Sequence, residues 1–157
     1  MKQSVYIEST VISYLIARPS RDLIVAGHQQ LTREWWDFAL PKLDPFISQF
    51  VINEISLGDP VASKSRIKIA SDFPLLEMKP GIASLADQYF RAIRIPEKAK
   101  SDAFHLAIAA WHGLDYMVSW NCTHIASGRV RAIVEQINAK NNFATPTICT
   151  PEELMEV

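Results

Sequence analysis

The sequence predicts an α/β fold in which a mainly parallel sheet is covered by helices on both faces. Two observations lead to this prediction: short apolar runs alternate with longer segments of helical periodicity, and no linker, repeat or low-complexity tract divides the 157 residues. Alternating strands and helices form βαβ units, and these units build parallel sheets. The chain is therefore expected to be one domain spanning residues 1–157.

The expected strands are short apolar runs that are bounded by polar or turn-forming residues. The first begins close to the N-terminus and leads through Ser9 and Thr10 into a helical turn, where hydroxyl side chains can cap the helix. The sequence predicts strands at residues 5–8, 45–48, 75–78, 116–119 and 147–149.

The expected helices separate these strands and carry recognisable boundary residues. Pro41 stops the longest of them, and Gly113 ends the clearest one as a C-cap. A further helix start is expected at Thr150-Pro151-Glu152-Glu153. The sequence predicts helices at residues 11–16, 22–40, 51–57, 64–70, 82–95, 102–112 and 128–139.

Composition narrows the functional class. With 48% hydrophobic and 21% charged residues the chain matches ordinary globular proteins, and no apolar run approaches the roughly 20 residues of a membrane span. The N-terminal segment has no signal-peptide pattern, so a cytoplasmic location is expected, with Cys122 and Cys149 as free thiols. A net charge of −1 argues against a dedicated nucleic-acid binder, so a polyanion would have to be met through a local basic patch or bound cations.

Four polar side chains follow the predicted strands closely. Glu8 closes the first strand, Glu54 follows the second, Asp102 opens a helix, and Asn121 follows the strand at 116–119. In parallel sheets ligands bind beyond the carboxyl ends of the strands, near the point where strand order reverses. Three carboxylates and an amide oxygen in one dry cleft would repel each other unless a hard cation lay among them. Mg²⁺ or Mn²⁺ is the expected cation.

Each of these four residues also has an explanation that involves no ligand. Asp102 could be a helix N-terminal charge favoured by the macrodipole, and Asn121 could cap a turn. Glu8 could pair with a neighbouring cation, and Glu54 could lie on a solvated helix face. Their shared position at strand ends favours the metal site.

Several segments resemble the motifs of PIN domains, and they occur in the same order along the chain. Residues 6–15 resemble the opening segment, in which an acidic residue at a strand end precedes Ser/Thr residues. Residues 52–55 resemble the glutamate-bearing second segment, and residues 101–109 are similar to the third, an aspartate that opens an alanine-rich helix. Residues 116–121 match the fourth, a strand leading to Ser/Thr and then an acidic position, and residues 148–154 resemble the family's tail.

The resemblance implies a three-layer α/β/α sandwich and an Mg²⁺- or Mn²⁺-dependent endoribonuclease. It carries the catalytic positions onto Glu8, Glu54, Asp102 and Asn121, with the first three as metal ligands. The chain has the length of single-domain VapC-like toxins. The expected partners are therefore an RNA substrate, a small cognate antitoxin and a second copy in a homodimer, with no membrane.

Two departures from the family pattern affect the expected chemistry. The first acidic position is usually Asp, whereas Glu8 is longer by one methylene, and the fourth is usually acidic, whereas Asn121 is neutral. The missing charge should weaken metal affinity. The hydroxyl of Thr10 or Ser119 could position a ligand or a water. His105 could contact substrate phosphate or a metal-binding carboxylate, with a purely structural histidine as the favoured alternative, and His124 could lie in a loop that touches RNA.

Two other functions remain open from the sequence. One is a catalytically decayed PIN-like module that binds RNA or a protein partner, with Asn121 marking the decay. The other is a small-molecule hydrolase or phosphatase that uses the same carboxylates. Retained metal binding without cleavage would indicate the first, and activity on generic phosphoesters would indicate the second.

Overall fold

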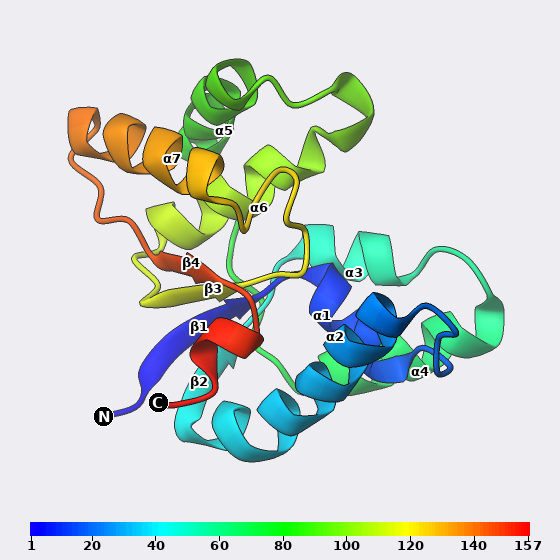
Figure 1. The fold of residues 1–157 in the computed structure, drawn as a ribbon. Coiled ribbons are helices and arrows are strands. Elements are labelled where there is room, and N and C mark those ends of the chain that lie inside the picture. The colour runs from blue at the N-terminus through cyan, green and yellow to red at the C-terminus, as the bar shows by residue number, and fades with distance from the viewer.

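The computed structural model describes all residues from 1 to 157 and contains a four-stranded sheet of order β2-β1-β3-β4 (Figure 1). Every neighbouring pair of strands is parallel. The strands are β1 (Gln3–Ile7), β2 (Leu43–Phe46), β3 (Tyr116–Val118) and β4 (Thr147–Cys149). This parallel sheet flanked by helices confirms the predicted three-layer α/β/α class.

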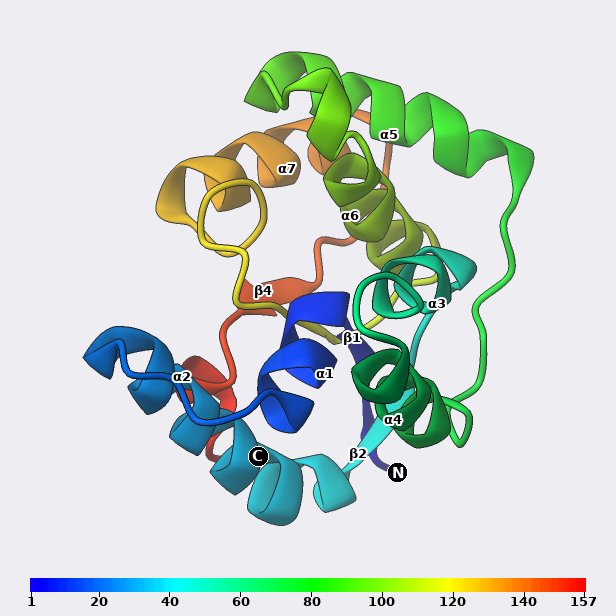
Figure 2. The ribbon, with the colours of Figure 1, turned by 90° about the vertical axis from the view of Figure 1, so that its right-hand side faces the viewer.

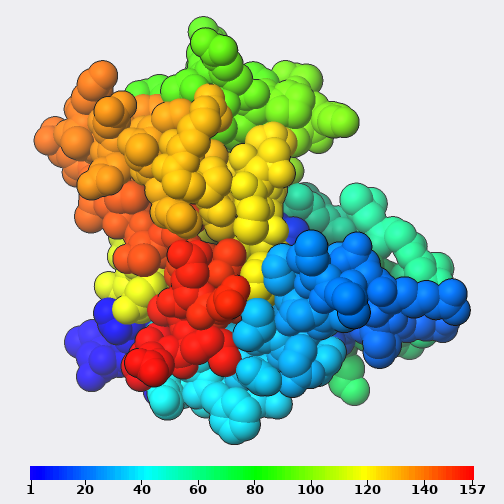
Figure 3. Space-filling model, in the orientation of Figure 1, coloured from blue at the N-terminus to red at the C-terminus, as the bar shows by residue number.

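Helices cover both faces of the sheet. They are α1 (Ser9–Ile16), α2 (Leu23–Glu34), α3 (Gln49–Ile55), α4 (Pro60–Ala70), α5 (Pro80–Ile93), α6 (Ser101–Trp111) and α7 (Gly128–Lys140). Figure 2 shows α1 and α2 on one side of the sheet and α5, α6 and α7 on the other. The C-terminal 3-10 turn Glu152–Leu154 contacts α2, and in Figure 3 this red segment lies between the orange α7 and the cyan end of α2.

The core lies on both faces of the central strands. Val5, Tyr6 and Ile7 of β1 are fully buried, as are Met117 and Val118 of β3. Such continuous apolar burial is expected of strands that helices cover on both faces. The sheet is therefore fixed from both sides, which gives the loops at its carboxyl edge a rigid base.

The strand predicted at residues 75–78 is wrong. Only Leu75 pairs with the sheet, through a single bridge to Ile47, and the side chains of Leu75 and Met78 are 52% and 44% exposed. Pro74 has no N–H to donate, and Pro80 already begins α5. The N–H of Leu76 donates to the carbonyl oxygen of Ile47 at 2.8 Å, but beyond this bond nothing joins the segment to the sheet as a fifth strand.

The helix predicted over residues 22–40 is not regular throughout. The α-helical part, α2, ends at Glu34, and the chain continues as a π-helical turn at Trp35–Ala39 and a 3-10 turn at Leu40–Lys42. The π-helical turn keeps Trp35 and Ala39 fully buried. The irregular turns thus adapt the helix end to the core before Pro41 ends it.

The two cysteines are free thiols, as the sequence predicts. Cys122 is exposed, whereas Cys149 lies buried in β4, where burial raises the pKa of its thiol to about 12. No helix reaches the length and apolar character that crossing a membrane would require.

Two helical glycines allow a matched test of packing. A Cβ added at Gly27 in α2 would meet nothing within 4 Å, whereas one at Gly81 in α5 would lie 2.3 Å from Cη2 of Trp111. We expect Gly27→Ala to stabilise the protein by about 0.5–1 kcal/mol, because alanine lowers the entropy of the unfolded chain. Gly81→Ala should cost about 1–3 kcal/mol, because the Trp111 ring must move. Urea unfolding of both variants measures this, and equal effects would contradict it.

Candidate metal centre

The candidate site lies at the carboxyl edge of the sheet, between its two central strands. Glu8 directly follows β1, and its N–H donates to the carbonyl oxygen of Val118 in β3 at 3.1 Å. From β1 the chain crosses to β2 on one side, and later strands extend the sheet on the other. Strand order therefore reverses between β1 and β3, at the position where α/β sheets bind ligands.

The carboxylate of Glu8 is buried and held by four donors. Glu8 is 2% exposed. It accepts hydrogen bonds from Oγ of Ser9 at 2.8 Å, from the N–H and Oγ1 of Thr10 at 3.2 and 2.5 Å, and from Oγ of Ser119 at 2.5 Å. The N–H bond caps α1. These donors replace the water that burial removes, so a charge can remain at this place. Thr10 and Ser119, predicted as supporting residues, both bind Glu8.

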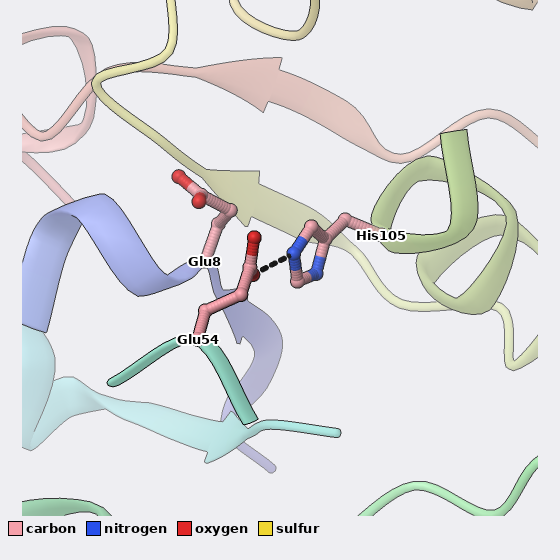
Figure 4. A group of neighbouring side chains, drawn as sticks. All are labelled: Glu8, Glu54 and His105. Atoms are coloured by element: carbon pink, nitrogen blue, oxygen red, sulfur yellow. Dashed lines mark hydrogen bonds and ion pairs between the residues drawn. The ribbon is translucent and has the colours of Figure 1, made fainter. Parts of the chain in front are cut away.

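Glu54 in α3 lies beside Glu8 and is the more accessible of the two carboxylates. Its side chain is 30% exposed. Oε1 is hydrogen-bonded to Nε2 of His105 (Figure 4). Oε1 also accepts from Oγ of Ser9 at 3.1 Å, and Oε2 accepts from Oγ of Ser101 at 3.2 Å. Oγ of Ser9 is thus within hydrogen-bonding distance of both carboxylates.

One ligand atom from each of Glu8, Glu54 and His105 lies within 4.8 Å of the others. Asp102, the third ligand that the sequence predicts, is outside this group, although it precedes His105 by one turn of α6. Its Oδ2 is hydrogen-bonded to Nδ1 of His124 at 2.9 Å, and its side chain is 11% exposed. The structure therefore brings Glu8 and Glu54 together with His105, whereas the carboxylate of Asp102 is bound to His124 and is not part of this cluster.

Asn121 does not present its oxygen to the carboxylates. Its Oδ1 accepts the N–H groups of Thr123 at 3.3 Å and His124 at 3.0 Å. The amide therefore caps the turn of its own loop, which is the alternative that the sequence left open for it. His124, for which the sequence suggests a supporting role toward the substrate, has its Nδ1 2.9 Å from Oδ2 of Asp102.

The pKa values of the Glu54–His105 pair shift in opposite directions. Burial by itself would raise the pKa of Glu54, but the hydrogen bond and charge of His105 and the hydroxyls of Ser9 and Ser101 outweigh it, so the pKa is lowered. Burial by itself would lower the pKa of His105, but the hydrogen bond and charge of Glu54 and the charges of Glu8 and Asp102 raise it. The site thus favours an ionised Glu54.

Because the pKa of Glu54 is lowered in the folded protein, the free energy of unfolding should decrease at acid pH. A carboxyl whose folded pKa is depressed stabilises the protein above its ordinary value of 4.5, and this contribution is lost as pH falls through the folded pKa. Glu54→Gln has no such titration, so its unfolding free energy should fall less steeply than that of the unmodified protein below pH ~4.5. Urea unfolding across acid pH, with the exposed Glu135→Gln as control, measures it. Parallel curves for the protein and Glu54→Gln would contradict this expectation.

Ser9, Tyr6 and Ser48 contribute to the site, although the sequence did not indicate them as site residues. Ser9 was considered only as a helix cap, and Tyr6 and Ser48 were counted within strands. Tyr6 is fully buried, and its hydroxyl lies 2.6 Å from Nδ1 of His105 and 2.7 Å from Oγ of Ser48. A signal was present, because a tyrosine in a strand buried on both faces needs a polar partner for its hydroxyl.

The arrangement is chemically suited to a divalent cation. Two carboxylates within ligand distance, both already oriented by hydroxyl donors, are the oxygen ligands that Mg²⁺ and Mn²⁺ take. Asp102 lies outside this cluster, but its charge is close enough to act on His105. Two surface hollows lie elsewhere, one between β4 and α7 and one between α1 and α4, and neither includes Glu8, Glu54 or Asp102.

Comparisons with known proteins assign no relative. No protein-family model, curated protein or solved structure matches the chain.

Proposed function

We propose that the chain is a metal-dependent endoribonuclease in which Glu8, Glu54 and Asp102 form the site that hydrolyses phosphodiester bonds. The observation that carries the proposal is the pair of carboxylates, Glu8 and Glu54, within 4.8 Å of each other at the point where strand order reverses. The choice of RNA as substrate rests on the resemblance of the sequence to PIN domains.

The three carboxylates contribute in different ways. An Mg²⁺ or Mn²⁺ ion at this place would supply an activated water and compensate the charge that develops on the phosphate. Glu8 is fixed by its four donors and forms the buried wall of the site. Glu54, whose side chain is 30% exposed, forms its accessible side, where a phosphodiester can approach, while Asp102 is largely buried and bound to His124.

The proposal includes a protein partner, a small antitoxin, and a homodimeric assembly. A nuclease of this kind would harm its host unless it were inhibited. Leu23, Ile24 and Phe38 are 89%, 72% and 69% exposed, which provides apolar surface on α2 and the π-helical turn that follows it. Expression of the chain alone should slow growth, and co-expression of the inhibitor should restore it.

Cleavage of a labelled single-stranded RNA tests the enzymatic proposal. We expect cleavage with Mg²⁺ or Mn²⁺, none with EDTA, and a loss of at least ~10²–10³-fold in Glu54→Gln and Asp102→Asn, because each amide keeps the shape but removes a charge. Glu135→Gln, on the exposed side of α7, is the matched control and should cleave normally. Undiminished cleavage in EDTA or by both site variants would refute the proposal.

A second candidate, a decayed module that binds a partner or RNA without cleaving it, is favoured by one observation. The oxygen of Asn121 is committed to the N–H groups of Thr123 and His124, so the fourth acidic position of the family pattern supplies no charge here. Calorimetric binding of Mn²⁺ without cleavage of any RNA would favour this candidate.

A further inference from the structure

A buried row of hydrogen bonds runs from Glu54 into the core. Nε2 of His105 is hydrogen-bonded to Oε1 of Glu54, and Nδ1 of the same ring lies 2.6 Å from the hydroxyl of Tyr6. The Tyr6 hydroxyl lies 2.7 Å from Oγ of Ser48. His105, Tyr6 and Ser48 are all fully buried, so no solvent completes their hydrogen bonding.

The two ends of this row determine which atom donates at every step. An ionised Glu54 has no hydrogen and can only accept, so Nε2 of His105 must carry one. At the other end, the hydroxyl of Ser48 has a single partner, the Tyr6 oxygen, and must therefore donate to it. The only remaining acceptor for the hydroxyl hydrogen of Tyr6 is then Nδ1 of His105.

If the donors of the row pointed the other way, from His105 toward Ser48, one buried hydrogen would have no acceptor. If Nδ1 of His105 carried a hydrogen, it would donate to Tyr6, and Tyr6 would donate to Ser48. The hydrogen of Ser48 would then have no acceptor at a place that bulk solvent does not reach, which is unfavourable. All hydrogens of the row are satisfied only when the neutral ring carries its hydrogen on Nε2.

From this geometry we infer that Ser48, Tyr6 and His105 are positioning residues, forming a one-way row of donors that ends on Glu54 and fixes its carboxylate. His105 then acts through Glu54 and is not itself a metal ligand, because a hydrogen occupies the nitrogen that faces the cluster. The ligand set is Glu8, Glu54 and Asp102, and this last statement rests on the proposed function. Partners that orient a ligand in this way typically change metal affinity about 10–100-fold when they are removed.

The hydrogen position on His105 is measured by long-range ¹H–¹⁵N correlation spectra of the full chain labelled on histidine nitrogen. The spectra are recorded without metal over a pH series from ~7 to ~10, because the pKa of His105 is raised above that of an unperturbed histidine. His105→Gln assigns the signal among the four histidines. We expect the neutral ring, reached at the upper end of this series, to carry its hydrogen on Nε2. A neutral ring that carries its hydrogen on Nδ1 would overturn the inference.

Metal affinity tests whether His105 works by donating. In Mn²⁺ calorimetry His105→Gln, whose amide N–H can replace the Nε2 donor, should bind within about threefold of the unmodified protein. His105→Leu, which has no donor, should bind about 10–100-fold more weakly. If both variants lose affinity equally, the ring nitrogen itself binds the metal and the inference is wrong. If the unmodified protein binds no Mn²⁺, the proposed function and the ligand set fail, while the spectra still decide the direction of the row.

Discussion

Glu8→Gln is expected to reduce RNA cleavage by at least ~10³-fold, which corresponds to about 4 kcal/mol of transition-state stabilisation. The substitution removes one of the two neighbouring carboxylate charges of the proposed metal site, and the one that is buried. It also places an amide NH₂ group among donors, since Ser9, Thr10 and Ser119 all donate to this carboxylate. Glu8 is therefore expected to be more sensitive than the more exposed Glu54.

Loss of activity at Glu8 has to be separated from loss of the fold. Hydrogen bonds to a charged group contribute about 1.5–3 kcal/mol each, so Glu8→Gln should also lower the unfolding free energy. Activity is therefore compared at a temperature where circular dichroism shows the variant to be folded. Glu8→Asp keeps the charge but shortens the reach, and should retain part of the metal affinity. A folded Glu8→Gln protein that cleaves RNA at the normal rate would contradict the proposed site.

Trp120→Ala is expected to destabilise the protein by about 3–5 kcal/mol, the usual cost of removing a buried tryptophan. Trp120 is 7% exposed, and its ring stacks on His28 with centroids 4.1 Å apart. Its Nε1 donates to Oγ1 of Thr32 at 2.7 Å, and its backbone N–H donates to Oγ1 of Thr10 at 2.9 Å. The residue thus joins the carboxyl end of β3 to both α1 and α2.

Urea unfolding of Trp120→Ala, with Trp36→Ala as a control, measures this contribution. Trp36 is only half buried, so its replacement should cost less. Thr32→Val, which removes only the hydroxyl that Trp120 binds, should account for about 1–3 kcal/mol. A loss below ~1 kcal/mol for Trp120→Ala would show that the ring is not part of the packing between these elements.

The sequence by itself determined the α/β class because it depends on local pattern. Alternating apolar runs and helical segments predict a parallel sheet between helix layers, and this is the architecture observed. The pattern failed at residues 75–78, where the apolar residues suggested a strand. Whether an apolar run becomes a strand depends on a neighbour that can pair with it, and beyond Leu75 no such neighbour exists. That information is not local.

For the site, sequence placed Glu8, Glu54 and Asp102 at one edge of the sheet, because the carboxyl ends of parallel strands meet there. Only the tertiary structure decided what each side chain contacts. Packing of α3 against α6 brings His105 to Glu54, 51 residues earlier in the chain, and the turn after β3 directs the oxygen of Asn121 into its own loop. Strand order fixes the position of a residue, whereas its partners depend on rotamers and helix packing that join distant segments, so no local pattern contains them.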